Sequence, residues 1–228
     1  MPRFRSVARR FPRPVMALIV VGLPLTLVGC GAAKSLINNN LPTVSNALQL
    51  DGQSVTGTVN GSRATISGNG TKEFSFANTT INQAGSLAEI KHSQKLTRSV
   101  TVTVPTGETL PTSFQLRNIA LAMVLSDRQT NTGGDLEERT FAATLTVGST
   151  VTFSRTGSDN TYTAINAPAF GDLVISGDRL TQFRNIVTGG GSPNQVGLRL
   201  SFDTDDFTLP NGSTITFTFT EGKATVKI

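Results

Sequence analysis

Apolar and polar residues alternate along most of the chain from residue 51 onward. In "VTVTV" the valines Val100, Val102 and Val104 share one face, and the threonines between them share the other. The same period of two places further apolar sets on one face: Val151 and Phe153; Leu198, Leu200 and Phe202; Ile215, Phe217 and Phe219; Ala224, Val226 and Ile228. Alternation of β-branched and aromatic residues with polar ones predicts half-buried β-strands.

Glycine-containing pairs separate several of these strands. Asn60-Gly61 lies between "SVTGTV" and "SRATIS" and predicts a hairpin turn, because both residues tolerate a positive φ. Asn211-Gly212 and Glu221-Gly222 predict turns in the same way, the second one between the last two expected strands.

The apolar positions change parity within one long segment. Phe114 and Leu116 are followed by Ile119 and Leu121, so the apolar face moves from even to odd positions. An extra residue near Arg117-Asn118 would produce this shift, and we therefore expect a β-bulge there.

Helical periodicity is credible only in residues 82–96, "NQAGSLAEIKHSQKL". Strands that follow one another without intervening helices pair antiparallel, and regular turn spacing favours a sandwich. The expected fold is therefore an all-β, antiparallel β-sandwich over residues 51–228, with at most one short helix. An immunoglobulin-like topology rests on the strand count alone.

Two short segments recur in the same order. "GSTVTF" at 148–153 matches "GSTITF" at 212–217, and Arg117-Asn118-Ile119 matches Arg184-Asn185-Ile186. Two interpretations stay open. One is a duplicated β unit, which would divide residues 51–228 into two subdomains, and the other is chance recurrence in strands rich in Thr, Gly and Ser.

The first 29 residues differ from the rest of the chain. They contain five arginines and no acidic residue, then an apolar run over residues 15–28, and Gly29 directly before Cys30. This run is shorter than the roughly 20 residues that a membrane-spanning helix needs. A basic segment, a short apolar core and a small residue at the expected cleavage site predict a secretory signal peptide over residues 1–29.

The end of this leader, Leu27-Val28-Gly29-Cys30, resembles the lipobox of bacterial lipoproteins, and the resemblance covers residues 1–30 only. It implies diacylglycerol transfer to the Cys30 sulfur, cleavage after Gly29 and acylation, for example with palmitate, of the new amino terminus. Several acyl chains on one residue give stable membrane anchoring. Residues 30–50 would form a lipidated tether. Gly31 after the cysteine, in place of aspartate, favours the outer membrane in a diderm host.

Composition narrows the function classes. Without the five leader arginines, 15 of the 20 basic residues remain, equal to the 15 acidic residues, so a nucleic-acid partner is not expected. A single cysteine allows no internal disulfide. The chain has 13 Phe, one Tyr and no Trp, which argues against a carbohydrate module built on exposed aromatic platforms.

Catalytic and metal chemistry have few candidate residues. His92 is the only histidine, and within the expected helix we predict that it is solvated. No Gly-x-Ser-x-Gly segment occurs, so no catalytic residue is assigned. One His and an acylated Cys cannot form a zinc or copper site.

Calcium requires only oxygen ligands, so the acidic cluster after a predicted strand is the remaining metal candidate. Asp203, Asp205 and Asp206 are weak calcium candidates, and solvated turn carboxylates are the alternative. Apart from the lipid on Cys30, no cofactor is expected.

Together these observations favour a non-enzymatic, lipid-anchored protein of the bacterial cell envelope with a structural or protein-interaction role at the surface. Its expected partners are the membrane, through the lipid, and an envelope protein. Two alternatives stay open. One is a module that binds a small apolar ligand between its Phe-rich sheets, and the other is an envelope hydrolase with His92 as its general base.

Overall fold

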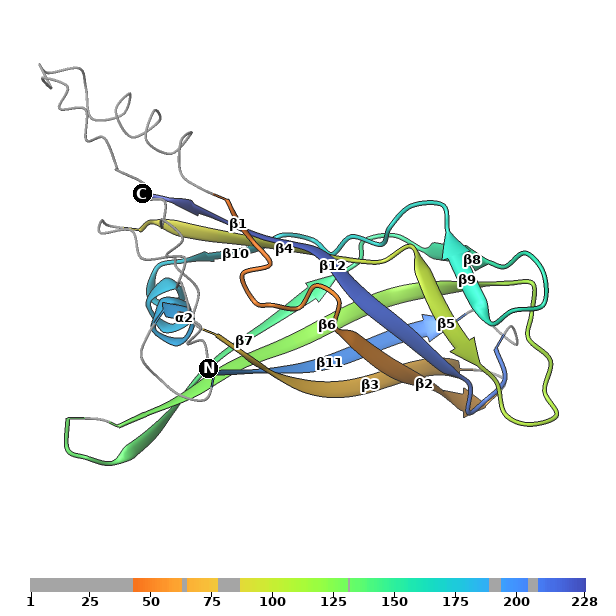
Figure 1. The fold of residues 1–228 in the computed structure, drawn as a ribbon, viewed down its shortest axis with the longest axis horizontal. Coiled ribbons are helices and arrows are strands. Elements are labelled where there is room, and N and C mark those ends of the chain that lie inside the picture. The colour runs from red at the N-terminus through yellow and green to blue at the C-terminus, as the bar shows by residue number, and fades with distance from the viewer. Residues whose placement is uncertain (1–42, 63–64, 78–86, 131, 189–193, 205–208) are drawn as a thin grey trace, which may run out of the picture.

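The computed structural model describes residues 43–62, 65–77, 87–130, 132–188, 194–204 and 209–228, shown as coloured ribbon in Figure 1. The leader, Cys30 and residues 31–42 lie outside this part. The elements are β1 (Val44–Ser45), β2 (Ser54–Ser62), β3 (Thr65–Phe76), β4 (Glu89–Leu96), β5 (Ser99–Thr103), β6 (Ser113–Thr130), β7 (Leu136–Thr146), β8 (Val151–Ser154), β9 (Thr161–Ala164), β10 (Leu173–Ser176), α2 (Asp178–Thr188), β11 (Asn194–Thr204) and β12 (Thr214–Lys227). The described chain is mostly antiparallel sheet with one short helix, so the prediction of an all-β, sandwich-like fold is confirmed.

Eight of these strands pair in a closed ring. The hydrogen-bonded order runs β12-β2-β3-β11-β6-β8-β9-β5, and β5 pairs in turn with β12. The last strand of the chain therefore closes a circuit that begins with its pairing to β2, the first long strand. We call this part of the molecule the ring.

The two longest strands continue out of the ring and form an open half. The first part of β12 pairs with β2 and β5, and its second part pairs with β4 and β1. Likewise, the first part of β6 pairs with β8 and its second part with β7. An immunoglobulin-like topology would keep its two sheets separate. Here β12 and β6 belong to both halves of the molecule, and Figure 1 shows them running along its length.

Each of these strands contains a β-bulge where the ring passes into the open half. In β6, Asn118 and Ile119 face only Phe202 of β11, which confirms the bulge predicted near Arg117-Asn118. In β12, Glu221 and Gly222 face only Gln94 of β4. We call these pairs the β6 bulge and the β12 bulge. Each extra residue changes the parity of the buried positions, so the apolar side chains on both sides of the bulge face the core.

Phenylalanine side chains fill the interior. Phe202 and Phe217 pack with ring centroids 5.6 Å apart, and Phe114 and Phe153 stack at 5.4 Å. The Phe202 ring also lies over Gly68 of β3, where an added methyl group would overlap with the ring. A glycine at position 68 is therefore what lets this large ring enter the core.

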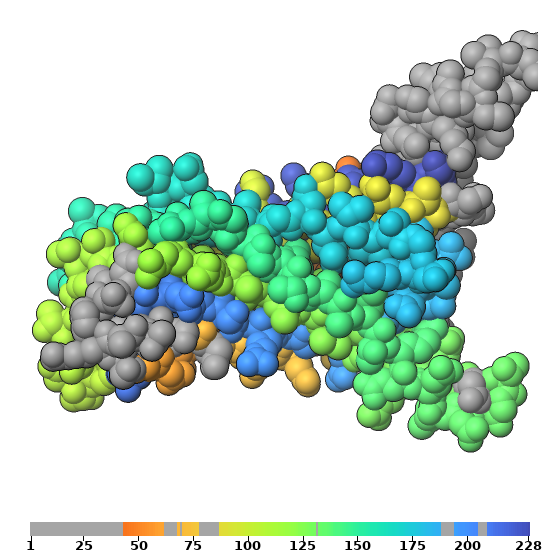
Figure 2. Space-filling model, turned by 180° about the vertical axis from the view of Figure 1, so that it is seen from behind, coloured from red at the N-terminus to blue at the C-terminus, as the bar shows by residue number. Residues whose placement is uncertain are grey.

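Helix α2 covers the space between β7 and β10 in the open half. Its residue Phe183 packs edge-on against Phe141 of β7, with the centroids 5.2 Å apart. Arg179 lies over the same Phe141 ring and donates a hydrogen bond to the Ala142 carbonyl at 2.6 Å. Figure 2 shows the far side of the molecule, where the tip of the β6–β7 hairpin projects beyond the body.

The predicted helix over 82–96 is wrong in its described part, because residues 89–96 form strand β4. Residues 82–86 lie outside the described part. The inward positions of β4 are Ile90, His92, Gln94 and Leu96, and the two polar residues among them conceal the period of two. The helix forms instead at 178–188, where Leu180, Phe183, Ile186 and Val187 are buried.

Two of the three predicted turns are also wrong. The segments on either side of Asn60-Gly61 do pair antiparallel, as β2 and β3, but Asn60 and Gly61 lie inside β2 opposite Ser67 and Ile66, so the predicted position of the turn is wrong. Glu221-Gly222 is a bulge within one continuous strand. The turn at Asn211-Gly212 is confirmed, with Gly212 at φ 84°.

The two matched segments differ in what the structure makes of them. Residues 117–119 belong to β6, whereas residues 184–186 belong to α2, so the shared Arg-Asn-Ile sequence adopts two conformations. Residues 148–153 and 212–217 both lead from a loop into a strand, β8 and β12. Duplication and chance recurrence therefore both stay open.

Candidate functional site

Residues 43–53 form a strap that lies against the second half of β12. Three of its side chains, those of Ala47, Leu48 and Leu50, are buried in the core. Residues 43–50, which we expected in the tether, therefore belong to the folded body. The apolar spacing of "NALQL" was the signal for this, but the segment is too short to distinguish from a loop by pattern.

Backbone hydrogen bonds join the strap to β12. The Asn46 amide donates to the Gly222 carbonyl at 2.6 Å, and the Gly52 amide donates to the Phe219 carbonyl at 2.9 Å. In return, the Phe219 amide donates to the Gln53 carbonyl at 2.9 Å. The strap thus occupies the strand edge that the β12 bulge presents.

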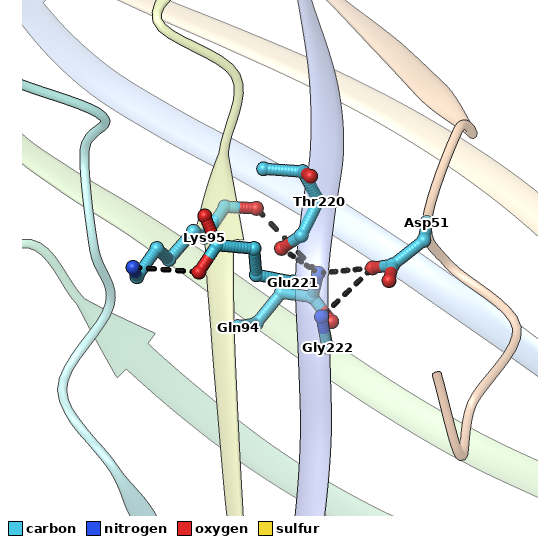
Figure 3. Close-up of polar contacts among 6 residues, drawn as sticks. All are labelled: Asp51, Gln94, Lys95, Thr220, Glu221 and Gly222. Atoms are coloured by element: carbon cyan, nitrogen blue, oxygen red, sulfur yellow. Dashed lines mark hydrogen bonds and ion pairs between the residues drawn. The ribbon is translucent and has the colours of Figure 1, made fainter. Parts of the chain in front are cut away.

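The Asp51 carboxylate fixes the strap to the β12 bulge (Figure 3). Its Oδ1 accepts a hydrogen bond from the Gly222 amide at 2.9 Å and one from Gln94 Nε2 at 3.1 Å. Gln94 Nε2 also donates to the Thr220 carbonyl at 2.9 Å. Asp51, Gln94 and Gly222 therefore form a latch that connects the strap, β4 and β12. Charge-assisted bonds of this kind are stronger than neutral ones.

Outside the latch, Lys95 and Glu221 form an ion pair with an Nζ to Oε2 distance of 2.7 Å. Both side chains are more than 40% exposed. The hydrogen bond from Lys95 lowers the pKa of Glu221 below its ordinary value. An exposed pair of this type contributes little to folding stability.

We call the contact between the strap and the β12 bulge the strap joint. His92 of β4 lies next to this joint and is buried, with only 1% of its surface exposed. The prediction of a solvated histidine on a helix is therefore wrong. Burial lowers the pKa of His92 to about 4, because the charged imidazolium would lose its hydration, and the nearby Asp51 charge opposes part of this shift. The Gln94 side chain is a second group that opposes this shift. Neither His92 Nδ1 nor Gln94 Oε1, both buried, forms a well-aligned hydrogen bond within the described part of the chain.

Left-handed backbone conformations gather at the same joint. Four non-glycine residues of the described chain have a φ near +50°, and three of them belong to the strap or the β12 bulge: Asn46 (49°), Gln49 (54°) and Glu221 (53°). Asparagine tolerates this region, whereas for Gln and Glu it costs roughly 1–2 kcal/mol per residue. The strap joint therefore combines strained backbone with unsatisfied buried polar atoms.

The fourth such residue, Asn118 at φ 52°, lies in the β6 bulge. Its Nδ2 donates to Asp203 Oδ2 at 2.7 Å, and Arg117 faces Asp203 across the strand pair. The calcium candidate Asp203 therefore faces hydrogen-bond donors, which repel a cation. The other candidates, Asp205 and Asp206, lie outside the described residues. Within the described ranges no three His, Cys, Asp or Glu side chains gather as a metal site.

Two hollows flank the loop at residues 147–150, next to the β6 bulge. One, of about 500 Å³, is lined by Arg117, Asn118 and the hydroxyls of Ser149 and Thr150. The other, of about 390 Å³, lies beside Ile165, which is 81% exposed. Their linings combine hydroxyl and alkyl groups, and the first hollow adds the Arg117 charge.

The sequence pattern indicates one of the two bulges and nothing of the latch. Asp51 precedes Gly52, a pair typical of a turn, and nothing in that pattern indicates contact with residues 94 and 222. Cys30, the predicted lipidation site, lies outside the described residues.

No helix in the described ranges is both long and apolar enough to cross a membrane. Comparisons with protein-family models, with curated proteins and with solved structures found no match.

Proposed function

We propose that this chain is a lipid-anchored protein of the bacterial cell envelope, with a structural or protein-interaction role at the surface. The observation that carries the proposal is Cys30, directly after a basic, apolar leader that ends in Leu27-Val28-Gly29. Residues 31–42 would link the lipid to the strap, and a chain of 12 residues spans at most about 40 Å. The lipid would hold the body close to the membrane surface.

The packing of the interior and the burial of His92 count against the two alternative functions. Phe202, Phe217, Phe114 and Phe153 pack in pairs, and such contacts make them core residues more readily than the lining of a ligand cavity. This counts against the alternative of an apolar ligand held between the sheets.

The burial of His92 counts against the hydrolase alternative, since its best general base has no access to solvent.

Membrane fractionation with mass spectrometry of the amino-terminal peptide tests the anchor. We expect the wild-type chain in the membrane fraction, with a peptide that begins at an acylated Cys30. The Cys30→Ser variant should be folded and released from membranes. An unmodified Cys30, or a Cys30→Ser variant that stays bound to membranes, would contradict the proposal.

A pull-down from detergent-solubilised envelopes tests the interaction role. A protein that co-purifies in stoichiometric amount with the wild-type chain would support it. A pure monomer that carries a small molecule, extracted by hot solvent, would replace it with the carrier function.

A further inference from the structure

We propose that the strap, residues 43–53, is a clasp that opens as a unit while the ring stays closed, and that tension on the preceding chain opens it. The tension part rests on the proposed anchoring, because an anchored body is pulled through the chain that precedes Thr43. The opening itself follows from the strap joint alone.

The clasp is small and its attachments are local. It pairs with β12 through β1 and through the backbone of Phe219 and Gly222, and the Asp51 latch joins it to Gln94. Its three buried side chains and a bond from Gln49 to the Ala77 carbonyl add to these contacts. The backbone partners and the latch belong to the open half, at or beside the β12 bulge. Release of the strap breaks no strand pairing of the ring. The ring can therefore stay folded when the clasp opens.

The joint also holds unfavourable features that opening relieves. Gln49 has a left-handed backbone that an opened strap need not keep. His92 Nδ1 and Gln94 Oε1 form no well-aligned hydrogen bond among the described residues, and water could supply one once the strap opens. Strain of this kind persists only where surrounding contacts fix it, and it is frequent in elements that switch. The latch is the contact that fixes it here.

Opening would uncover two features of the body. The first is the backbone edge of β12 from Phe219 to Gly222, which the strap now pairs. The second is the apolar slot that Ala47, Leu48 and Leu50 fill. Tension on an anchored chain would thus change the surface that the body presents.

Hydrogen exchange with mass spectrometry, performed on the full chain in detergent, tests the opening. We expect the amides of Asn46 and Gly52 to exchange at least 100-fold faster than those of β11, at the centre of the ring. Their rate should be nearly independent of low urea concentrations, since a local opening exposes little surface. Equal protection and equal urea dependence in the strap and β11 would overturn the proposal.

A pair of variants tests whether the ring survives release. Leu48→Ala with Asp51→Ala removes a buried side chain and the latch, and we expect unprotected strap amides with β11 protection retained. Asp203→Ala is the matched control, because it removes a carboxylate from the other bulge, and it should change strap exchange by less than twofold. A Leu48→Ala/Asp51→Ala chain that unfolds throughout would show that the strap is integral to the fold and would overturn the clasp.

The Gln49→Gly variant tests whether backbone strain at this residue, rather than the loss of side-chain contacts, governs how often the strap opens. Glycine adopts a positive φ without steric cost, so this variant should slow strap exchange about threefold, although it loses a 3.3 Å side-chain bond to the Ala77 carbonyl. Faster exchange in Gln49→Gly would mean that contacts alone govern the strap and that backbone strain does not promote its opening.

Force spectroscopy, with handles at the two ends of the chain, tests the response to tension. Release of 11 strap residues adds about 4 nm of chain length, and we expect this step before the main unfolding event. A single event without the early step would overturn the tension part. Neither hydrogen exchange nor force spectroscopy requires the lipid on Cys30, so a failure of anchoring and a failure of the clasp are distinguishable.

Discussion

The two bulges are alike in geometry and differ in their surroundings. In each, two residues face one, and the first of the two has a φ near +50°: Asn118 in β6 and Glu221 in β12. In each bulge the first residue is exposed and the second is buried. The polar contact of the β6 bulge, Asn118 with Asp203, joins neighbouring strands. The β12 bulge is bonded instead to the strap, through Asp51, which is 171 residues away in sequence. The same type of bulge can therefore serve only to shift the strand register, as in β6, or also bind a segment that is distant in sequence, as in β12.

The largest expected effect is the pH dependence that His92, at the strap joint, gives to the free energy of unfolding. The folded pKa of His92, about 4, is below its ordinary value of 6.5, so the unfolded chain binds a proton that the folded chain excludes. Stability is therefore undiminished above pH 6.5 and falls as the pH decreases toward 4, by about 3 kcal/mol in total.

Urea unfolding of the wild type and of His92→Gln at several pH values measures this loss. The variant should lack most of the decrease between pH 6.5 and 4, whatever its stability at pH 7.5. Parallel curves for the two proteins would contradict the burial of an uncharged His92.

The next largest effect concerns space at the β12 bulge. A methyl group on Gly222 would lie 2.7 Å from Gln94 Oε1 and 3.1 Å from Asp51 Oδ1. Gly222→Ala should therefore disturb the latch and lower the free energy of unfolding by about 2 kcal/mol. Gly148→Ala, beside the β6 bulge, is the control, since nothing lies within 4 Å of the added group. Equal urea midpoints for the two variants would contradict the prediction that an added methyl group is tolerated less well at Gly222 than at Gly148.

An exchange of the bulge residues should have a smaller effect. Asn118→Gln places a residue that avoids positive φ in the β6 bulge and should cost about 1 kcal/mol in thermal or urea unfolding. Glu221→Asn makes the opposite change in the β12 bulge and should raise the urea midpoint. If both variants shift the midpoint in the same direction, backbone strain is not what distinguishes the two positions.

The smallest effect is expected at the exposed ion pair. Lys95→Gln should leave the urea midpoint unchanged within error, because solvent screens this pair. Its visible consequence should be a rise in the pKa of Glu221, which the Lys95 hydrogen bond now lowers, measured by NMR titration. A large loss of stability in Lys95→Gln would mean that the pair belongs to the latch.

The same comparison shows what the sequence could predict. The β6 bulge was predictable because Phe114, Leu116, Ile119 and Leu121 record the change of parity as a run of large apolar residues. In β12 the same change occurs across Thr220, Glu221 and Gly222, and glycine next to a polar residue is equally typical of a hairpin turn. Only the pairing with β4 and the strap distinguishes a bulge from a turn there.

The rest of the joint was out of reach for a related reason. Asp51, Gln94 and Gly222 are brought together by the topology, and no local pattern relates them. His92 and Gln94 occupy inward positions of β4, where a period-two pattern requires apolar residues, so the strand resembled an amphipathic helix. The strands themselves were predictable because their alternation is local, whereas the partners of polar core residues depend on distant contacts.

The closure of the ring by β12 sets the order in which the molecule can be completed. Residues 214–227 pair with β2, β5, β4 and β1, so no earlier part of the chain can form the full sheet. Folds that depend on pairing between distant segments form slowly, because the entropy of loop closure must be overcome first. A newly made chain therefore stays incomplete until its final residues emerge. For the exported protein that we propose, this delay would keep the chain unfolded until its transport is complete.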